Sequence, residues 1–492
     1  MSAAALAVAP KRIVWQPQPK QAAFLARPEY EGLYGGAAGG GKSDALLAEA
    51  LRQVHIPWYR AIIFRRTFPD LADLIDRSLE IYPFAFPRAK YNGAGHFWLF
   101  PSGAKIYFGS MPHDADRFRY RGRQFDFIGF DELTLFSWEQ YSYMFSRNRA
   151  KGPNTRVYIR STTNPGGIGH GWVKDRFVTA APPMTPIKTE YEIIRPDGSR
   201  QKIVRYRVFV PATVFDNKML LTNDPMYLAR LAMMPAAYRD ALLYGSWDSF
   251  EGQCFREWTN DPAHYDDQLH THVIKPFPIP KHWPVYRSLD WGYSKPYSVG
   301  WYTMDEDGRA YRIAEMYGCT GEPNVGVQQH PSQVAAAIAG MERDHPLLKG
   351  RKITGVADPS IFDVSRGPSI AEMMAASPNF IYWEPGDNTR IPGKMQYHYR
   401  LAFDADDRPM LYVFNTCTNF IRTLPTLVYD PVRVEDVDTK QEDHIYDECR
   451  YLLMSHPMQA PKIVEQKPKS YDPLDLWNDP TKPLDKYKFY RI

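Results

Sequence analysis

The chain has 492 residues, enough to bury two or three separate cores, and its 44% hydrophobic and 24% charged residues exclude a disordered or fibrous protein. A formal net charge of +4 permits nucleic acid as a partner without requiring it. The four cysteines lie far apart and form no C-x-x-C pair, so we expect neither a disulfide framework nor a zinc site, as in a protein of a reducing cytosol.

The amino-terminal segment is alanine-rich but carries no targeting pattern. Met1–Pro10 lacks an apolar core long enough for a signal peptide or a membrane span, so we expect no export and no membrane association. A helix is predicted within Val14–Leu25, and Gln21 lies in it. The Gln21 amide both donates and accepts, so it could read an adenine base, although a helix glutamine that faces solvent is an equally common interpretation.

A glycine-rich stretch between Glu31 and Ala45 is the strongest single signal. Gly36, Gly41, Lys42 and Ser43 form the phosphate-binding pattern G-x-x-x-x-G-K-[ST]. Two further glycines, Gly39 and Gly40, lie inside it. Glycines let consecutive backbone N–H groups turn towards a triphosphate, while Lys42 would reach its β- and γ-phosphates and Ser43 its Mg²⁺. A chance turn is the alternative, but an apolar strand precedes the loop and good helix formers follow it. We therefore predict nucleotide binding.

Three segments after the loop carry further signals in the sequence. Arg60–Arg66 is predicted to be a buried parallel strand with charge at its carboxyl end, and His96–Ser110 to be two strands around a Pro-Ser-Gly turn. Asp116–Arg123 alternates aromatic residues with Arg117, Arg119, Arg121 and Arg123. In an extended conformation these arginines would share one face and contact an anion, although a solvated surface explains any single one.

The second nucleotide signal is the apolar segment Phe125–Glu132, which ends in two acids. After a phosphate loop, such a strand predicts that Asp131 holds the Mg²⁺ shell and that Glu132 activates the attacking water. Val157–Ser161 is predicted to be a third strand, and it runs into small polar residues that would sense the γ-phosphate. These are Thr162, Thr163 and Asn164. A plain turn is the alternative for this last segment.

The chain then becomes less informative for about a hundred residues. Prolines and charges between Ala180 and Tyr206 predict surface insertions, and Tyr227–Leu243 is predicted to be a helix. The polar, proline-punctuated stretch that ends at Pro280 is where we place the domain boundary.

The second half has a different pattern. Val285–Gly292, Ser298–Met304 and Ala310–Tyr317 predict a β-meander with Asp290 in its first strand. A helix over Pro331–Arg343 and a short buried strand over Lys352–Asp358 are predicted to follow.

Acids from three predicted elements could converge in this half. Asp290 comes from the meander and Asp358 from the end of the later strand, whereas Glu442–Met454 is predicted to be a helix with three polar residues on one face, Asp443, His444 and Asp447. Together they could hold two divalent cations and hydrolyse phosphodiesters, although each acid alone is as well explained by a cap or a surface charge.

With these motifs in this order, from about Trp15 to Met454, the chain resembles the large terminase subunits of tailed bacteriophages. The resemblance implies an α/β protein: a P-loop (ASCE-type) ATPase domain followed by an RNase H-like α/β nuclease domain. We expect the ATPase domain at 1–250, a linker at 251–280, the nuclease domain at 281–460 and a loose tail at 461–492.

The resemblance also implies roles for individual residues. ATP with Mg²⁺ would be bound by the loop together with Asp131, Thr163 and Asn164, and Gln21 resembles the adenine-contacting glutamine of the family. Arg121, or else Arg123, would be the arginine finger that acts in a neighbouring subunit. Two Mg²⁺ or Mn²⁺ would be held by Asp290, Asp358 and Asp447, with His444 and Asp443 beside them.

The implied function is a viral DNA-packaging motor that translocates double-stranded DNA into the prohead and cuts the concatemeric genome. Its expected partners are DNA, the small terminase subunit, the portal protein and further copies in a homo-oligomeric ring on the prohead. It would act in the cytoplasm of the infected bacterium and be absent from the mature virion. A P-loop helicase or repair ATPase with an accessory RNase H-like domain, and a non-catalytic DNA-binding assembly module, remain the alternatives.

Overall fold

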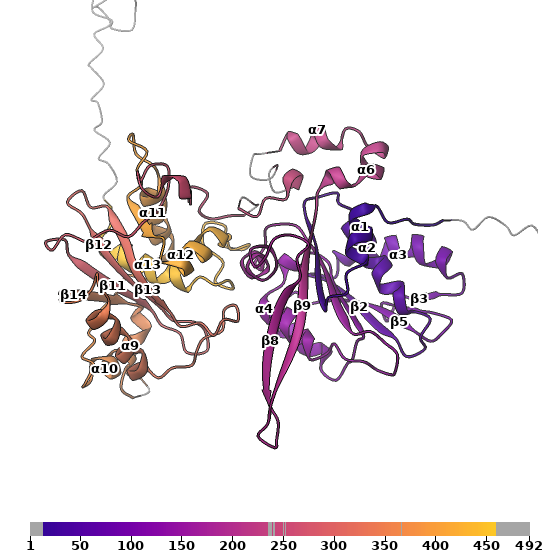
Figure 1. Ribbon diagram of the computed structural model, residues 1–492, viewed down its shortest axis with the longest axis horizontal. Coiled ribbons are helices and arrows are strands. Elements are labelled where there is room, and N and C mark those ends of the chain that lie inside the picture. Colours follow the sequence, from indigo (N-terminus) through magenta and orange to yellow (C-terminus); the bar gives the residue numbers. More distant parts are fainter. Residues whose placement is uncertain are drawn as a thin grey trace, which may run out of the picture. The chain divides into compact units, whose positions relative to one another are not determined.

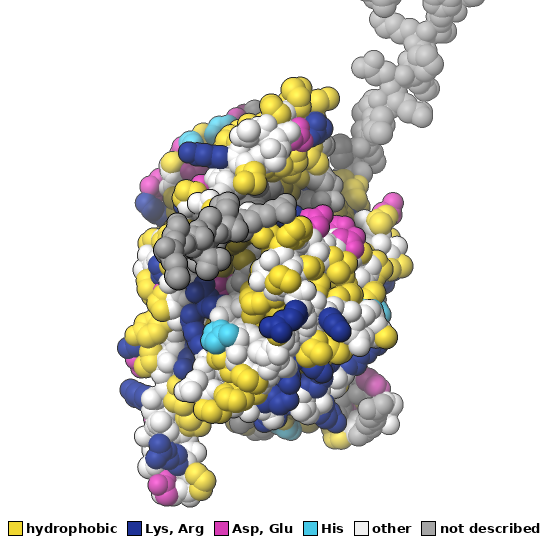
Figure 2. Space-filling model, turned by 90° about the vertical axis from the view of Figure 1, so that its right-hand side faces the viewer, with side chains coloured by type: hydrophobic (Ala, Val, Ile, Leu, Met, Phe, Trp, Pro, Cys, Tyr) yellow, Lys and Arg dark blue, Asp and Glu magenta, His cyan; other side chains and the backbone are white. Residues whose placement is uncertain are grey.

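The computed structural model describes residues 13–458, except 235–238, 240, 241, 249, 251 and 366. Two α/β sheets organise this part of the chain, one built from residues 31–212 and the other from residues 273–414 (Figure 1). No helix in the described ranges is both long and apolar enough to cross a membrane. The predicted tail over 461–492 lies outside the described residues. On the face drawn in Figure 2, Lys and Arg side chains form several groups.

The first sheet has nine strands in the order β3-β4-β5-β2-β6-β7-β1-β9-β8. Its bounds are β1 Glu31–Gly36, β2 Arg60–Arg65, β3 Lys90–Asn92, β4 Phe97–Leu99, β5 Lys105–Ser110, β6 Phe127–Phe130, β7 Tyr158–Thr163, β8 Ile187–Ile194 and β9 Arg200–Ala212. The six central strands, from β5 to β9, are parallel. The carboxyl ends of β1, β6 and β7 therefore lie at one edge, where open α/β sheets bind ligands.

The central strands are buried on both faces because their apolar residues are nearly continuous. Ile62 and Phe64 of β2 pack into the core on one face, whereas Ala61 and Ile63 pack into the core on the other. Such two-sided burial is expected for parallel strands covered by helices. The helices of this half are α1 Pro19–Leu25, α2 Lys42–Ala50, α3 Leu71–Ala85, α4 Trp138–Phe145, α5 His170–Val173, α6 Lys218–Asn223 and α7 Tyr227–Ala232, with shorter turns η1 Leu51–Gln53, η2 Asp114–Tyr120, η3 Leu133–Leu135, η4 Lys174–Val178 and η5 Val214–Asp216.

The second sheet has seven strands in the order β10-β16-β13-β12-β11-β14-β15. Its bounds are β10 Val273–Ile274, β11 Val285–Asp290, β12 Ser298–Met304, β13 Ala310–Tyr317, β14 Ile353–Ala357, β15 Glu384–Pro385 and β16 Leu411–Phe414. The predicted meander is present as the antiparallel strands β11, β12 and β13, and β14 pairs parallel with β11. A three-strand meander flanked by parallel strands in this order is RNase H-like.

Helices complete the second half. They are α9 Pro331–Asp344, α10 Ile370–Ala375, α11 Arg390–Leu401, α12 Thr418–Thr423 and α13 His444–Ser455, with short turns η6 Pro262–His264, η7 Pro359–Phe362 and η8 Leu424–Thr426. Helix α13 packs along β11 and β12, and its Ile445, Cys449 and Leu452 are buried in the core of this sheet. The helix thereby brings its amino-terminal end to the carboxyl end of β11.

Of three further expectations, the extended arginine-rich segment is wrong, the surface insertion is an exposed hairpin, and the helix from Tyr227 is described only in part. The segment between Ala180 and Tyr206 contains most of the long β8–β9 hairpin, and β9 joins the sheet beside β1 (Figure 1). The arginine-rich segment is not extended, because residues 114–120 form the 3₁₀ helix η2. The helix predicted from Tyr227 is described as α7 only as far as Ala232, and residues 235–238, 240 and 241 lie outside the description.

Candidate functional site

The glycine-rich loop connects β1 to α2, as predicted. Gly41 is the N-cap of α2 and has φ 68°, and Gly39 has φ 70°, values that favour glycine because they lie in the left-handed region. Gly35, in β1, has φ 152°, and a Cβ there would lie 2.1 Å from the carbonyl oxygen of Thr163. The loop thus depends on backbone that passes too close to β7 for a side chain.

A cavity of about 380 Å³ opens over this loop. It is lined by Ala38, Gly39, Gly40, Gly41, Lys42, Ser43, Asp44, Asp131, Glu132, Asn164, Asn217 and Leu220. Seven predicted nucleotide-site residues and Glu132 are therefore brought together, whereas Gly36 ends β1 outside the lining. Backbone amides, an ammonium group and a Ser–Asp pair in one cavity suit a nucleotide phosphate with its Mg²⁺.

Lys42 is held at this cavity by two oxygens. Its Nζ donates to the carbonyl oxygen of Ala37 and, at 2.8 Å, to Oδ1 of Asn164. Burial lowers the pKa of Lys42 to about 8, although Asp131 and Glu132 work in the opposite direction. A phosphate group would supply the negative charge that favours the protonated lysine.

Asp131 lies directly after β6 and faces the loop. Both of its carboxylate oxygens are 3.3 Å from Oγ of Ser43, and Oδ1 also accepts from Oγ1 of Thr162. Arg65, at the end of β2, contacts Oδ2 from Nη2 at 2.6 Å and from Nε at 2.7 Å. A hydroxyl and a carboxylate this close are the pair that a P-loop uses to hold Mg²⁺, so the side chains present fit that ion.

Glu132 adopts a left-handed backbone conformation, with φ 59°. Its N–H donates to Oγ1 of Thr162 at 3.3 Å, and one carboxylate oxygen lies 3.7 Å from Nη1 of Arg65. Burial raises the pKa of Glu132, and Arg65 opposes this shift. A raised pKa makes the carboxylate a better proton acceptor, which suits a general base.

Thr163 and Gln21 do not line this cavity. The hydroxyl of Thr163 is directed to Thr134 at 3.3 Å and to the carbonyl oxygen of Asn164, away from the cavity. Nε2 of Gln21 donates to the carbonyl oxygen of Gly41 at 2.7 Å, and its Oε1 accepts from the N–H of Gln18 at 2.8 Å. The Gln21 amide is thus used to fix the loop. It borders a second cavity of about 370 Å³, which adjoins the first at Gly41.

Arg121 follows η2 and is exposed. Its guanidinium lies 5.5 Å from the ring centre of Phe118. Arg121 does not line the cavity of its own chain, which is compatible with action in another subunit.

In the second sheet, β11 delivers Asp290 at its last residue and β14 is followed by Asp358. The adjacent α13 begins at His444, with Asp443 as its N-cap and Asp447 one turn later. Asp290 and Asp443 are only 7% and 5% exposed. Burial raises the pKa of Asp290 to about 7 and that of Asp443 well above its usual range, and repulsion from Asp447 adds to both shifts.

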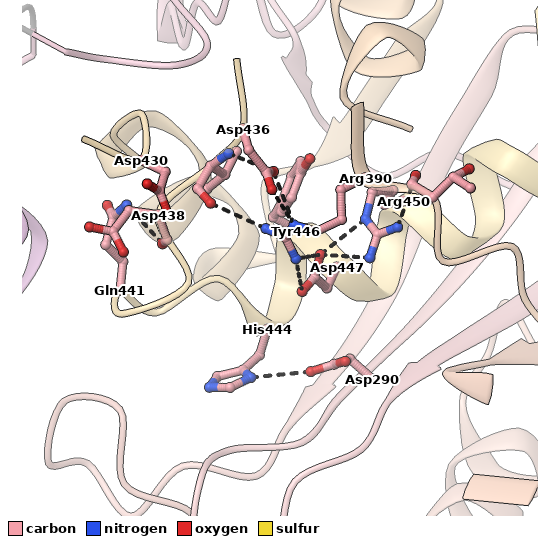
Figure 3. Close-up of polar contacts among 12 residues, drawn as sticks. Asp290, Arg390, Asp430, Asp436, Asp438, Gln441, His444, Tyr446, Asp447 and Arg450 are labelled. Atoms are coloured by element: carbon pink, nitrogen blue, oxygen red, sulfur yellow. Dashed lines mark hydrogen bonds and ion pairs between the residues drawn. The ribbon is translucent and has the colours of Figure 1, made fainter. Parts of the chain in front are cut away.

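His444 is held between two oxygens. Its Nδ1 lies 3.1 Å from Oδ2 of Asp290, and its Nε2 lies 2.9 Å from Oδ1 of Asn324 (Figure 3). Burial lowers the pKa of His444, but the contact with Asp290 and the neighbouring acids outweigh it, and the net shift is upward. When the ring is protonated, both of its nitrogens donate, and His444 then forms an ion pair with the ionised carboxylate of Asp290.

The other two predicted ligands have different partners. Asp447 contacts Arg390 Nη1 at 3.2 Å and Arg450 Nη2 at 2.9 Å (Figure 3), and the carboxylate of Asp358 accepts from the backbone and hydroxyl of Ser360. Among the described residues, no three acids, histidines or cysteines form a set able to hold one ion. The expected convergence of three acids is therefore incomplete, because arginines and a hydroxyl satisfy two of the carboxylates.

Several contributors were missed by the sequence reasoning. Arg65 was noted only as charge at a strand end, although it contacts both acids of the nucleotide site. Arg390 lies far from Asp447 in sequence, so no local pattern pointed to it. Asn217 lines the nucleotide cavity and donates to the carbonyl oxygen of Gly39, and its only signal was its position before a helix.

Several solved structures of bacteriophage large terminases are similar to this chain at low sequence identity. Among solved structures, the large terminase of a thermophilic bacteriophage aligns over 89% of this chain and 99% of its own, with 16% identity and a TM-score of 0.37. The HK97 bacteriophage large terminase covers 90% and 95%, with 11% identity and a TM-score of 0.43. The P22 large terminase nuclease domain covers 42% and 93%, with 16% identity and a TM-score of 0.31.

Among curated protein sequences, none matches significantly. A family model described as "Terminase large subunit, T4likevirus-type, N-terminal" matches residues 33–258, which include the phosphate loop, both acids after β6 and the segment after β7. Residues 33–258 of this chain are thus similar to the amino-terminal part of large terminase subunits.

Proposed function

We propose that this chain is the motor and nuclease subunit of a viral DNA-packaging machine. The observation that carries the proposal is the cavity over the phosphate loop, in which Ser43, Asp131 and Glu132 lie together with Lys42. The match of residues 33–258 to a large-terminase family model supports a role in packaging. DNA, the small terminase subunit, the portal protein and a homo-oligomeric ring on the prohead are the partners we propose, in the cytoplasm of the infected bacterium.

In the ATPase domain, proposed at 1–250, the chain's own residues position the nucleotide and the water. Backbone amides of Gly39–Gly41 and Nζ of Lys42 bind phosphates, and Asn164 releases Lys42 as it does so. Ser43 and Asp131 would hold Mg²⁺, which would neutralise phosphate charge. Glu132 accepts the proton of the attacking water, and Arg121 of a neighbouring copy stabilises the charge that develops on the phosphate. Such arginine fingers contribute about 10³ to 10⁵ in rate.

In the nuclease domain, proposed at 281–460 after a linker at 251–280, Asp290, Asp358 and Asp447 would hold two Mg²⁺ or Mn²⁺ ions beside Asp443 and His444. The buried, mutually repelling carboxylates of Asp290 and Asp443 create the negative potential that a divalent cation relieves. For this role, Asp447 has to leave Arg390 and Asp358 has to leave Ser360. Two bound ions would stabilise the attacking and leaving oxygens of a phosphodiester.

Translocation is tested by displacement of a third strand from a DNA triplex in the presence of ATP. We expect the wild-type protein, assembled on proheads, to release the strand, and Glu132→Gln to bind ATP without releasing it. A helicase would separate the duplex as well, and an assembly module would bind DNA without ATP turnover. Separation of the duplex would favour the helicase over the packaging motor, and DNA binding without ATP turnover would favour the assembly module.

Nuclease activity is tested separately with supercoiled plasmid in Mn²⁺, Mg²⁺ or EDTA. We expect cutting that needs a metal and is lost in Asp358→Ala. Cutting that persists in EDTA, or that Asp358→Ala leaves unchanged, would contradict the metal site proposed in the second sheet.

A further inference from the structure

Six cations lie in residues 117–123 and 147–151, two segments that meet where Phe125 pairs with Asn148 just before β6, and they define what is here called the basic surface. Its members are Arg117, Arg121, Arg123, Arg147, Arg149 and Lys151. Four of them, Arg121, Arg123, Arg149 and Lys151, are exposed. Within the described ranges of the chain, none of the six forms an ion pair with a carboxylate.

The two segments that carry these cations are joined side by side. The N–H of Phe125 donates to the carbonyl oxygen of Arg147 at 3.0 Å, and the N–H of Arg149 donates to that of Phe125 at 3.1 Å. The rings of Phe118 and Tyr143 also meet, with centroids 5.5 Å apart. The basic surface is therefore continuous, although its residues come from two parts of the sequence.

Aromatic rings hold several of the guanidinium groups in place. Arg117 lies 4.5 Å from the ring centre of Phe118, Arg147 lies 5.5 Å from that of Tyr143, and Arg123 lies 4.7 Å from that of Tyr107. A cation that is already stacked loses less conformational freedom when it meets a ligand. These arginines are thus ordered without having an anion to bind.

Acidic residues are absent from the sequence of both segments. No Asp or Glu occurs in residues 117–125 or in residues 140–174. Asp126, which directly follows the first segment, is fully buried, and its oxygens accept from the backbone N–H groups of Arg60 at 2.9 Å and Lys151 at 3.1 Å. Asp126 therefore does not neutralise the positive charge of the basic surface.

The nucleotide of the same chain cannot be the missing anion. Its cavity lies at the carboxyl ends of β1, β6 and β7, whereas Phe125 pairs with Asn148 just before β6 begins. Because these strands are parallel, their two ends lie at opposite edges of the sheet. The basic surface needs an anionic partner from outside the chain.

We propose that the basic surface, apart from Arg121, binds the phosphate backbone of double-stranded DNA without reading its sequence. This inference rests on the proposed function, which supplies DNA as the substrate. Unpaired, ring-stacked arginines match phosphates, which provide affinity but no base information. The segment 147–151 contributes to this contact independently of Arg121, whose finger role concerns a neighbouring nucleotide.

The test measures the association constant K for a DNA duplex of about 30 base pairs at salt concentrations between about 50 and 200 mM. Each phosphate contact that is lost reduces the slope of log K against log salt by about 0.9. We expect Arg149→Ala/Lys151→Ala to reduce this slope by about two. The variant should also bind duplexes of unrelated sequence more weakly, and by the same factor for each. Lys349→Ala/Lys352→Ala, which removes two exposed cations elsewhere, is the matched control. Binding of a fluorescent ATP analogue verifies that the variants are folded.

An unchanged slope in Arg149→Ala/Lys151→Ala, with wild-type DNA binding intact, would overturn the proposal and assign the surface to an acidic protein partner. Equal losses in the control pair would overturn it too, since general charge would then explain the binding. Failure of the wild-type protein to bind DNA at low salt would instead contradict the proposed function. Arg147→Glu provides a second variant and should weaken DNA binding further than Arg147→Ala.

Discussion

At the scale of single residues, Arg65 links the two acids of the nucleotide site. It contacts Asp131 at 2.6 Å and Glu132 at 3.7 Å, and its own side chain is only 16% exposed. A guanidinium in this position orients Asp131 and opposes the upward shift in the pKa of Glu132. Arg65 therefore influences both Asp131 and Glu132 without lining the cavity over the phosphate loop.

We predict that Arg65→Ala lowers kcat for ATP by about 10- to 100-fold, because removing a charged hydrogen-bond partner from a buried carboxylate costs about 1.5–3 kcal/mol. The adjacent Arg66, which donates to Gln140 instead, provides the matched control. Steady-state ATP hydrolysis in Arg66→Ala should stay within about threefold of wild type. An equal loss of kcat in both variants would show that Arg65→Ala lowers activity only by destabilising the fold.

At the scale of elements, the contact between β1 and β7 depends on Gly35. A Cβ at this position would lie 2.1 Å from the carbonyl oxygen of Thr163, in a backbone conformation that disfavours side chains. We predict that Gly35→Ala destabilises the protein by about 3 kcal/mol or more, as measured by urea unfolding. Gly93→Ala, where nothing lies within 4 Å, should change stability by less than about 0.5 kcal/mol.

Buried His272 connects three segments around the second sheet. Its Nδ1 accepts from the N–H of Thr259 at 3.0 Å, and its Nε2 donates to the carbonyl oxygen of Leu401 at 2.9 Å. This arrangement requires a neutral ring, and burial lowers the pKa of His272 to about 4. In the unfolded chain the ring takes up a proton below about pH 6.5. The contribution of His272 to the free energy of unfolding is therefore fully present above that pH and is lost as the pH falls towards 4.

We predict that His272 alone removes about 2 kcal/mol of stability between pH 7 and pH 5. The free energy of unfolding in urea should therefore fall less over this range in His272→Gln than in the wild-type protein. His55→Gln, which replaces an exposed histidine, should follow the wild-type curve. A parallel fall in wild type and His272→Gln would contradict this origin of the acid sensitivity.

Elements with strong periodicity or a strict motif could be predicted from the sequence. The loop between β1 and α2, the meander β11–β13 and helix α13 lie where they were expected, because local composition determines each of them. The β8–β9 hairpin was missed because its strands are exposed and charged, and only pairing of β9 with β1 reveals it. Arg65 and Arg390 act through residues distant in sequence, which a single sequence does not disclose.

At the scale of the whole molecule, the two proposed sites belong to different sheets and use different acids. Asp131 and Glu132 follow β6, whereas Asp290 ends β11 and Asp443 precedes α13. An ion that binds only the folded protein stabilises it by RT ln(1 + [L]/Kd), or about 2.7 kcal/mol at a hundredfold excess over Kd. Metal binding to the second sheet can therefore be measured without any nuclease assay.

We predict that Mn²⁺ without nucleotide raises the unfolding temperature of the wild-type protein and of Glu132→Gln alike. Asp290→Asn should abolish most of this increase, because it removes one of the two buried carboxylates whose repulsion the cation relieves. Asp307→Asn, in an exposed turn of the meander, should keep the full increase. The opposite result would be a rise in unfolding temperature that is lost in Glu132→Gln and kept in Asp290→Asn. It would show that Mn²⁺ binds at the first sheet and that the acids of the second sheet bind no metal.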